Sequence, residues 1–98
     1  MNGITYDQRV QTYTNALLRY GKANQLVIAL EEFSECQKEI CKVMRGQSNL
    51  NALAEEIADA TIMLEQVRLI FNLNDLVCEK MDEKVKRLDD RLRDEANA

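Results

Sequence analysis

The stretch ALEEFSECQKE, from Ala29 to Glu39, and the stretch LAEEIADATIM, from Leu53 to Met63, carry the same arrangement of acids. Each has two adjacent glutamates and a further acid three residues after the second glutamate. Both stretches are rich in residues that favour helices, and their apolar residues recur at helical spacing. The pattern therefore predicts two helices that carry carboxylates close to their apolar faces.

The composition of the whole chain predicts an all-α fold in a single domain, residues 1–98. Of the 98 residues 46% are apolar, glycine occurs three times and proline is absent. Gly21, Gly46 and residues 72–75 are candidate breaks between helices. A chain of this size is near the lower limit for folding alone and is expected to gain stability from association. Four helices are predicted, at Tyr6–Tyr20, Asn24–Met44, Leu50–Phe71 and Asp75–Asp94.

Apolar stripes run along the first and last of these predicted helices. The stripe of the first helix indicates packing against the bundle, with an aromatic ligand site as the alternative. The stripe of the last helix suits docking on other helices, so the first half of that helix is expected to lie in the bundle. The first stripe consists of Tyr6, Val10, Tyr13, Leu17 and Tyr20, and the last of Val77, Met81, Val85, Leu88 and Leu92.

Charge and hydropathy exclude several classes of partner. The formal net charge of -4 gives no electrostatic attraction to a nucleic-acid duplex or to an anionic membrane. The longest apolar run, Leu26 to Leu30, is far too short to cross a bilayer, and no export signal is found at the N-terminus. We therefore expect a cytoplasmic protein with neither a nucleic-acid duplex nor a membrane as partner.

The cysteines and the missing histidine narrow the possible chemistry. Cys36, Cys41 and Cys78 are odd in number and lack a Cys-x-x-Cys spacing, which favours reduced, buried thiols, with an incidental reactive thiol as the alternative. The absence of histidine excludes Ser-His triads, histidine-ligated zinc and histidine-containing di-iron bundles. Any chemistry must therefore use carboxylates, lysines and arginines.

The acids lie close to the apolar faces of their helices. With about 100° per residue, Glu32 borders the apolar stripe of its helix, and Glu56 falls inside the apolar arc of the next helix. Glu35 lies about 60° from Glu32 around the first of these helices, and Asp59 lies about 60° from Glu56 around the second. An unpaired buried carboxylate is too costly to keep ionised, so acids in these positions need partners.

The register of the two helices suggests what that partner is. A hairpin that turns between Arg45 and Gly46 places Glu32 opposite Asp59 and Glu35 opposite Glu56. Four carboxylates at one level repel one another, and ligands that are all oxygen suit Mg²⁺ or Mn²⁺. The alternative is that these acids belong to solvated helix faces, as expected for Glu31, Glu39 and Glu55.

A basic stripe follows the last predicted helix beside its apolar seam. Lys80, Lys84, Arg87 and Arg91 recur at helical spacing, and such a stripe can bind phosphates held against a metal site. The alternative is an ordinary exposed helix with local salt bridges.

The two acid motifs resemble the signature of the MazG-like all-helical nucleoside triphosphate pyrophosphohydrolases, a family that includes dimeric dUTPases and phosphoribosyl-ATP pyrophosphohydrolase. That signature is Glu-Glu-x-x-Glu and, after the turn between two helices, Glu-x-x-Asp. Here it reads EEFSE at residues 31–35 and EIAD at residues 56–59. The resemblance spans about residues 25–87 and implies a four-helix-bundle-type fold completed by formation of homodimers or homotetramers.

The resemblance also implies an activity, the Mg²⁺-dependent cleavage of a ribo or deoxy nucleoside triphosphate to the monophosphate and pyrophosphate. Family members often have a lysine, an asparagine four residues later and an arginine three residues after that. Lys80 and Arg87 match this pattern, whereas Lys84 stands in place of the asparagine. Gln25, two turns before Glu32 on the same face, is a candidate for contact with the base, or else part of the helix start. The implied catalytic metal ligands are Glu32, Glu35, Glu56 and Asp59, and the substrate-binding residues are Lys80, Lys84, Arg87 and Gln25.

A second hypothesis belongs to another functional class. The chain could be a non-catalytic helical oligomer, or a bundle that binds a partner, which keeps the shape of the family without its activity.

Overall fold

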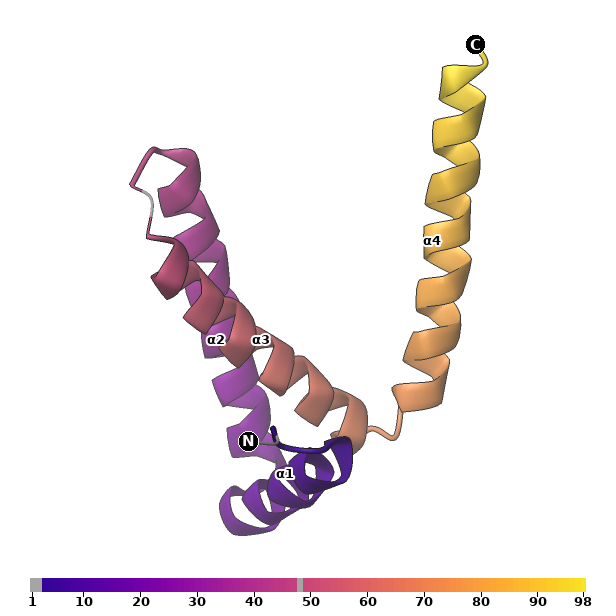
Figure 1. Cartoon of the computed structure of the whole chain (residues 1–98). Helices are drawn as coiled ribbons and strands as arrows, with labels where there is room; N and C mark the ends of the chain where they lie inside the picture. Colours follow the sequence, from indigo (N-terminus) through magenta and orange to yellow (C-terminus); the bar gives the residue numbers. More distant parts are fainter. Residues whose placement is uncertain (1–2, 48) are drawn as a thin grey trace.

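The computed structural model describes residues 3–47 and 49–98, which fold into helices without strands (Figure 1). The predicted all-α class and the number of helices are confirmed, and the predicted boundaries differ from the observed ones by at most two residues. The helices are α1 (Tyr6–Tyr20), α2 (Lys22–Met44), α3 (Leu50–Ile70) and α4 (Asn74–Ala96).

Local hydrogen bonds explain where the helices begin. At the start of α1, the backbone N–H of Gln8 donates to the hydroxyl of Thr5 at 3.1 Å, and the Thr5 N–H donates to the Gln8 side chain at 2.9 Å. At the start of α3, the Ala52 N–H donates to the Asn49 side chain at 3.0 Å. Between α1 and α2, Gly21 has a φ of 85°, a backbone conformation that glycine adopts without a steric penalty.

The α2–α3 hairpin forms the centre of the fold. These two antiparallel helices share the largest contact in the chain, and α1 packs where α2 begins and α3 ends (Figure 1). The buried apolar residues are Ala29 of α2, Ala60 and Met63 of α3, and Tyr13 of α1. Because this core is small, removing one of its larger side chains should have a measurable effect on stability.

The position of α4 contradicts the expectation that its first half lies in the bundle. Within the described residues α4 contacts only α3 among the helices and has no buried residue. Val77 is half-buried, whereas Met81, Val85 and Leu88 are exposed. The cause is the connection after α3: Asn72 adopts a φ of 52°, and α4 leads away from the hairpin (Figure 1).

The cysteines are free, as expected, but two of them are not buried. Cys36 is half-buried, while Cys41 and Cys78 are exposed. Cys41 is near the C-terminal end of α2, and Cys78 belongs to the helix that leaves the bundle. The expectation of buried thiols is therefore wrong for Cys41 and Cys78.

Within residues 3–47 and 49–98, no helix combines the length and the apolar character needed to cross a membrane.

Replacing Met63 with alanine tests the core. This side chain is only 5% exposed, so we expect the free energy of unfolding to fall by about 2–5 kcal/mol. Met44→Ala is the matched control, because Met44 is 81% exposed and its loss should change the free energy by no more than about 0.5 kcal/mol. Urea unfolding followed by circular dichroism, at equal chain concentrations, measures both variants. Equal losses in the two variants would contradict the assigned core.

Candidate metal centre

Three of the predicted acids meet between α2 and α3. One carboxylate oxygen from each of Glu32, Glu56 and Asp59 lies within 4.8 Å of the other two. Glu32 comes from α2, and the other two come from consecutive turns of α3. The side chains of Glu32 and Glu56 are half-buried and that of Asp59 is exposed. We refer to these three residues as the acid group.

Glu35 lies near the acid group without belonging to it. No oxygen of Glu35 meets the same distance limit, yet its negative charge acts on both Glu32 and Glu56. Its side chain is exposed on α2. The structure therefore gathers three of the four predicted ligands and places the fourth beside them at the surface.

One oxygen of the acid group lacks a protein partner. The Oε2 atom of Glu56 is buried and forms no hydrogen bond with the described residues. None of the salt bridges found among these residues involves Glu32, Glu56 or Asp59. A buried carboxylate oxygen in this state is costly unless a cation or a proton compensates it. Three converging carboxylates and one such oxygen fit a hard divalent cation, which prefers oxygen ligands.

The electrostatic surroundings of these carboxyls are entirely negative. Burial raises the pKa of Glu32, and the charges of Asp59, Glu56 and Glu35 raise it further. Burial likewise raises the pKa of Glu56, followed by the charges of Asp59 and Glu35. Both causes oppose the ionised form. A bound cation would remove the repulsion and favour ionisation.

The neighbouring acids that were expected on solvated faces make local contacts or point to solvent. Glu39 pairs with Lys42 on the same helix at 3.7 Å, and its side chain is only 13% exposed, so the expectation of a solvated face is wrong for Glu39. Glu55 accepts a hydrogen bond from the Asn51 side chain at 3.4 Å. Glu31 is exposed. These residues surround the acid group without being gathered into it.

The predicted substrate-binding residues are not gathered at the acid group. Lys80, Lys84 and Arg87 are exposed on α4, which diverges from the hairpin (Figure 1). Lys80 pairs locally with Glu83 at 3.4 Å. Gln25 is buried in α2 with 4% of its surface exposed. Within one chain, the structure thus separates the basic stripe from the acids.

The structure also contains a polar cluster that the sequence did not reveal. Glu65 of α3 accepts a hydrogen bond from the Tyr13 hydroxyl at 3.2 Å and one from the Arg9 guanidinium at 3.3 Å. Burial raises the pKa of Tyr13, and the Glu65 charge raises it further, so the phenol remains a donor. A signal for this cluster existed in Tyr13, because a buried tyrosine hydroxyl usually needs a partner.

The metal-free protein should show a pH dependence that arises from the acid group. The pKa values of Glu32 and Glu56 are raised above the ordinary 4.5 in the folded chain. The stability contributed by these carboxyls is therefore complete below that value and is lost as the pH rises through the raised values. We expect Glu56→Gln to gain stability relative to the original chain as the pH is raised from below 4.5 toward neutrality.

Urea unfolding in the presence of a chelator, repeated across this pH range, measures the effect. Glu95→Gln is the control, because Glu95 is exposed near the end of α4 and far along the chain from the acid group. The same pH profile for both variants would contradict the assigned repulsion.

Comparisons of the chain with models of protein families, with curated proteins and with solved structures find no match.

Proposed function

We propose that this chain is a Mg²⁺-dependent nucleoside triphosphate pyrophosphohydrolase, which cleaves ribo or deoxy triphosphates to monophosphates and pyrophosphate. The observation that carries the proposal is the acid group, with its buried Glu56 oxygen that lacks a protein partner. Further support comes from the order and spacing of the acids along the chain, which resemble the MazG-like signature. Mn²⁺ is an alternative cation, because it accepts the same oxygen ligands.

The acid group would hold the cation through Glu32, Glu56 and Asp59. When bound, Mg²⁺ supplies positive charge that polarises the α-phosphate, offsets the charge of the leaving pyrophosphate and lowers the pKa of a water molecule. Glu35, exposed beside the acid group, is suited to accept the proton of the attacking water. The water oxygen bonds to the α-phosphorus as the bond to the bridging oxygen breaks, and the electrons of that bond leave with pyrophosphate.

Contacts between the basic stripe and the phosphates of a substrate at the acid group require a second copy of the chain. The basic stripe of α4 cannot serve the acids of its own hairpin while α4 points away from it (Figure 1). Beside that stripe, α4 exposes Met81, Val85, Leu88 and Leu92, an apolar seam that favours association with other helices. A homodimer or homotetramer in which this seam is covered would bring Lys80, Lys84 and Arg87 toward the acids of another copy, where opposite charges attract.

The second candidate function is a non-catalytic helical oligomer or partner-binding bundle. The exposed α4 seam favours it equally, because an apolar helix face needs a cover whether or not the acids catalyse a reaction. The two functions differ in what the acid group does. Only the enzyme requires that this group bind a cation and support turnover.

Replacing Glu56 with glutamine separates these functions. We expect the variant to lose pyrophosphate release in the presence of Mg²⁺ while its metal-free melting temperature stays equal or rises, because one repelling charge has been removed. Glu55→Gln is the matched control, since it makes the same change at the adjacent exposed position and should retain turnover. The assay measures pyrophosphate with a panel of ribo and deoxy triphosphates.

Two outcomes would contradict the enzyme. One is no pyrophosphate from the original chain with any triphosphate of the panel. The other is a marked drop in the metal-free melting temperature of Glu56→Gln with turnover retained, the result expected when one member of a structural ion pair is removed.

Mixing two inactive variants tests whether α4 acts on another copy. Glu56→Gln keeps the basic stripe, and a double variant, Lys84→Ala with Arg87→Ala, keeps the acids. If each site joins the acids of one copy to the stripe of another, random exchange in a homodimer should restore about a quarter of the original activity, because half the pairs are mixed and each mixed pair has one intact site. Activity that stays absent while two variants with different affinity tags co-purify as mixed pairs would place both groups in one chain.

A further inference from the structure

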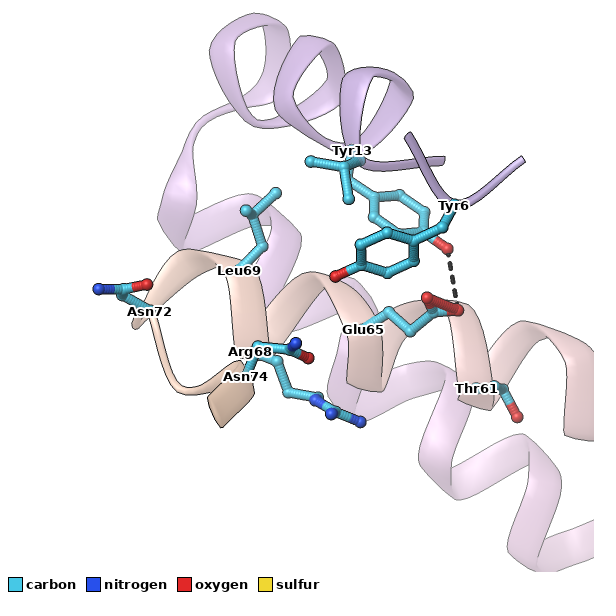
Figure 2. A pocket seen from close by; sticks show the side chains of 9 residues that line it. Tyr6, Tyr13, Thr61, Glu65, Arg68, Leu69, Asn72 and Asn74 are labelled. Atoms are coloured by element: carbon cyan, nitrogen blue, oxygen red, sulfur yellow. Dashed lines mark hydrogen bonds between the residues drawn. The ribbon is translucent and has the colours of Figure 1, made fainter. Parts of the chain in front are cut away.

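A pocket of about 370 Å³ lies between α1, α3 and the start of α4, away from the acid group. Its walls include Tyr6 and Tyr13 of α1 and Glu65 and Arg68 of α3 (Figure 2). With about 100° per residue, Glu65 and Arg68 lie about 180° and 120° around α3 from Glu56. The pocket therefore opens on a different face of α3 from the acid group.

The negative charge in this pocket is already neutralised. Glu65 pairs with the Arg9 guanidinium at 3.3 Å and accepts the Tyr13 hydroxyl at 3.2 Å. Figure 2 shows the Tyr13 hydroxyl directed at the Glu65 carboxylate. Neither of these contacts uses Arg68. The Glu65 carboxylate is thus paired with Arg9 and Tyr13 of α1, and it does not compensate the charge of a second cation.

Arg68 is a cation without an anion. Its Nε atom is buried and forms no hydrogen bond with the described residues, and its Nη2 atom donates a hydrogen bond to the Cys78 sulfur at 3.2 Å. None of the salt bridges among residues 3–47 and 49–98 involves Arg68. A thiol is a weak acceptor, and the buried Nε atom loses its hydration without a replacement partner. Together with the neutral Arg9–Glu65 pair, Arg68 leaves one positive charge in excess at the pocket.

The remaining walls offer a flat apolar surface and free amides. Tyr6 is half exposed, at 51%, and its ring forms part of the wall together with Leu69. Asn72 and Asn74 also line the pocket, although the Asn72 amide points away from Tyr6 and Glu65 (Figure 2). Neither amide appears in the side-chain hydrogen bonds of the described residues. An aromatic wall stacks on planar rings, and an amide can both donate to and accept from a polar ring edge.

We propose that this pocket binds a small molecule in which a planar ring carries one anionic group. The anion would pair with Arg68, whose guanidinium suits carboxylates and phosphates, and the ring would lie against Tyr6, with its polar edge toward Asn74. The volume is in the lower part of the range for small-molecule sites, about 300–1,000 Å³. Two sources share this chemistry, a nucleoside monophosphate and an aromatic carboxylate. The site does not depend on the proposed hydrolytic function.

Titrations of the ¹⁵N-labelled full chain, in buffer with a chelator and no divalent metal, test the site. The probes are adenosine 5′-monophosphate and benzoate, which join a ring to an anion, and adenosine and inorganic phosphate, which each supply one part. We expect saturable shifts of backbone amides around Tyr6, Arg68 and Asn74. Affinity for at least one joined probe should exceed that for either separate part by about tenfold or more. The joined probe that binds identifies the source of the ligand.

Arg68→Gln should weaken that binding by about tenfold or more, because it removes the charge that pairs with the anion. Arg93→Gln is the matched control, since Arg93 is exposed and paired with Asp89 on α4, and it should bind as the original chain does. Asn74→Ala, at an exposed position, provides a second variant that should weaken binding if Arg68→Gln fails to fold.

The proposal is overturned if neither joined probe saturates these amides, if the shifts centre on Glu32 and Glu56 instead, or if the pocket variants bind as tightly as Arg93→Gln. Because the measurement uses neither metal nor turnover, it is separable from the hydrolytic function. A chain without pyrophosphate release can still bind the probes, and an active enzyme can fail to bind them.

Discussion

Repulsion among carboxylates inside the α2–α3 hairpin is the constraint on which the rest of this structure depends. The hairpin forms the largest interhelical contact, and the same contact brings together the oxygens of Glu32, Glu56 and Asp59. Folding therefore places like charges where burial already opposes ionisation, as the raised pKa values of Glu32 and Glu56 indicate. The small apolar core around Ala29, Ala60 and Met63 must offset this cost, so a compensating cation would stabilise the fold as well as serve any chemistry.

The second constraint is the uncovered surface of α4. A helix that exposes a row of apolar side chains and buries none gains little from its own chain, because most helical stability in proteins comes from packing of the apolar face. The basic stripe lies next to this seam, and the acid group lies on the hairpin. The stripe and the acid group are opposite in charge, although α4 leads away from its own hairpin (Figure 1). Covering the seam with another copy would bury apolar surface, and placing its stripe beside the acid group would offset the repulsion among the carboxylates.

Local sequence signals predicted the helices and the meeting of the acids, but not the direction of α4. The turn signal at Gly46 sets the register of the hairpin, and that register alone places Glu32 near Asp59. The path of α4 depends on the backbone of Asn72, which takes a φ of 52°, and an apolar seam does not specify what covers it. The Arg9–Glu65 and Tyr13–Glu65 contacts were missed for a different reason. They join residues more than 50 positions apart, so they follow from how α1 crosses the hairpin and not from spacing along one helix.

Two buried polar atoms without protein partners lie on different faces of α3, and their charges are opposite. Oε2 of Glu56 belongs to a group that is short of positive charge, and Nε of Arg68 belongs to a pocket with one positive charge in excess. About three turns of helix separate these residues, so neither can neutralise the other through direct contact. Native structures rarely leave such atoms uncompensated. Glu56 therefore lacks a compensating cation on the side of α2, and Arg68 lacks a compensating anion on the side of α1. A ligand that compensates one of these residues leaves the other without a partner.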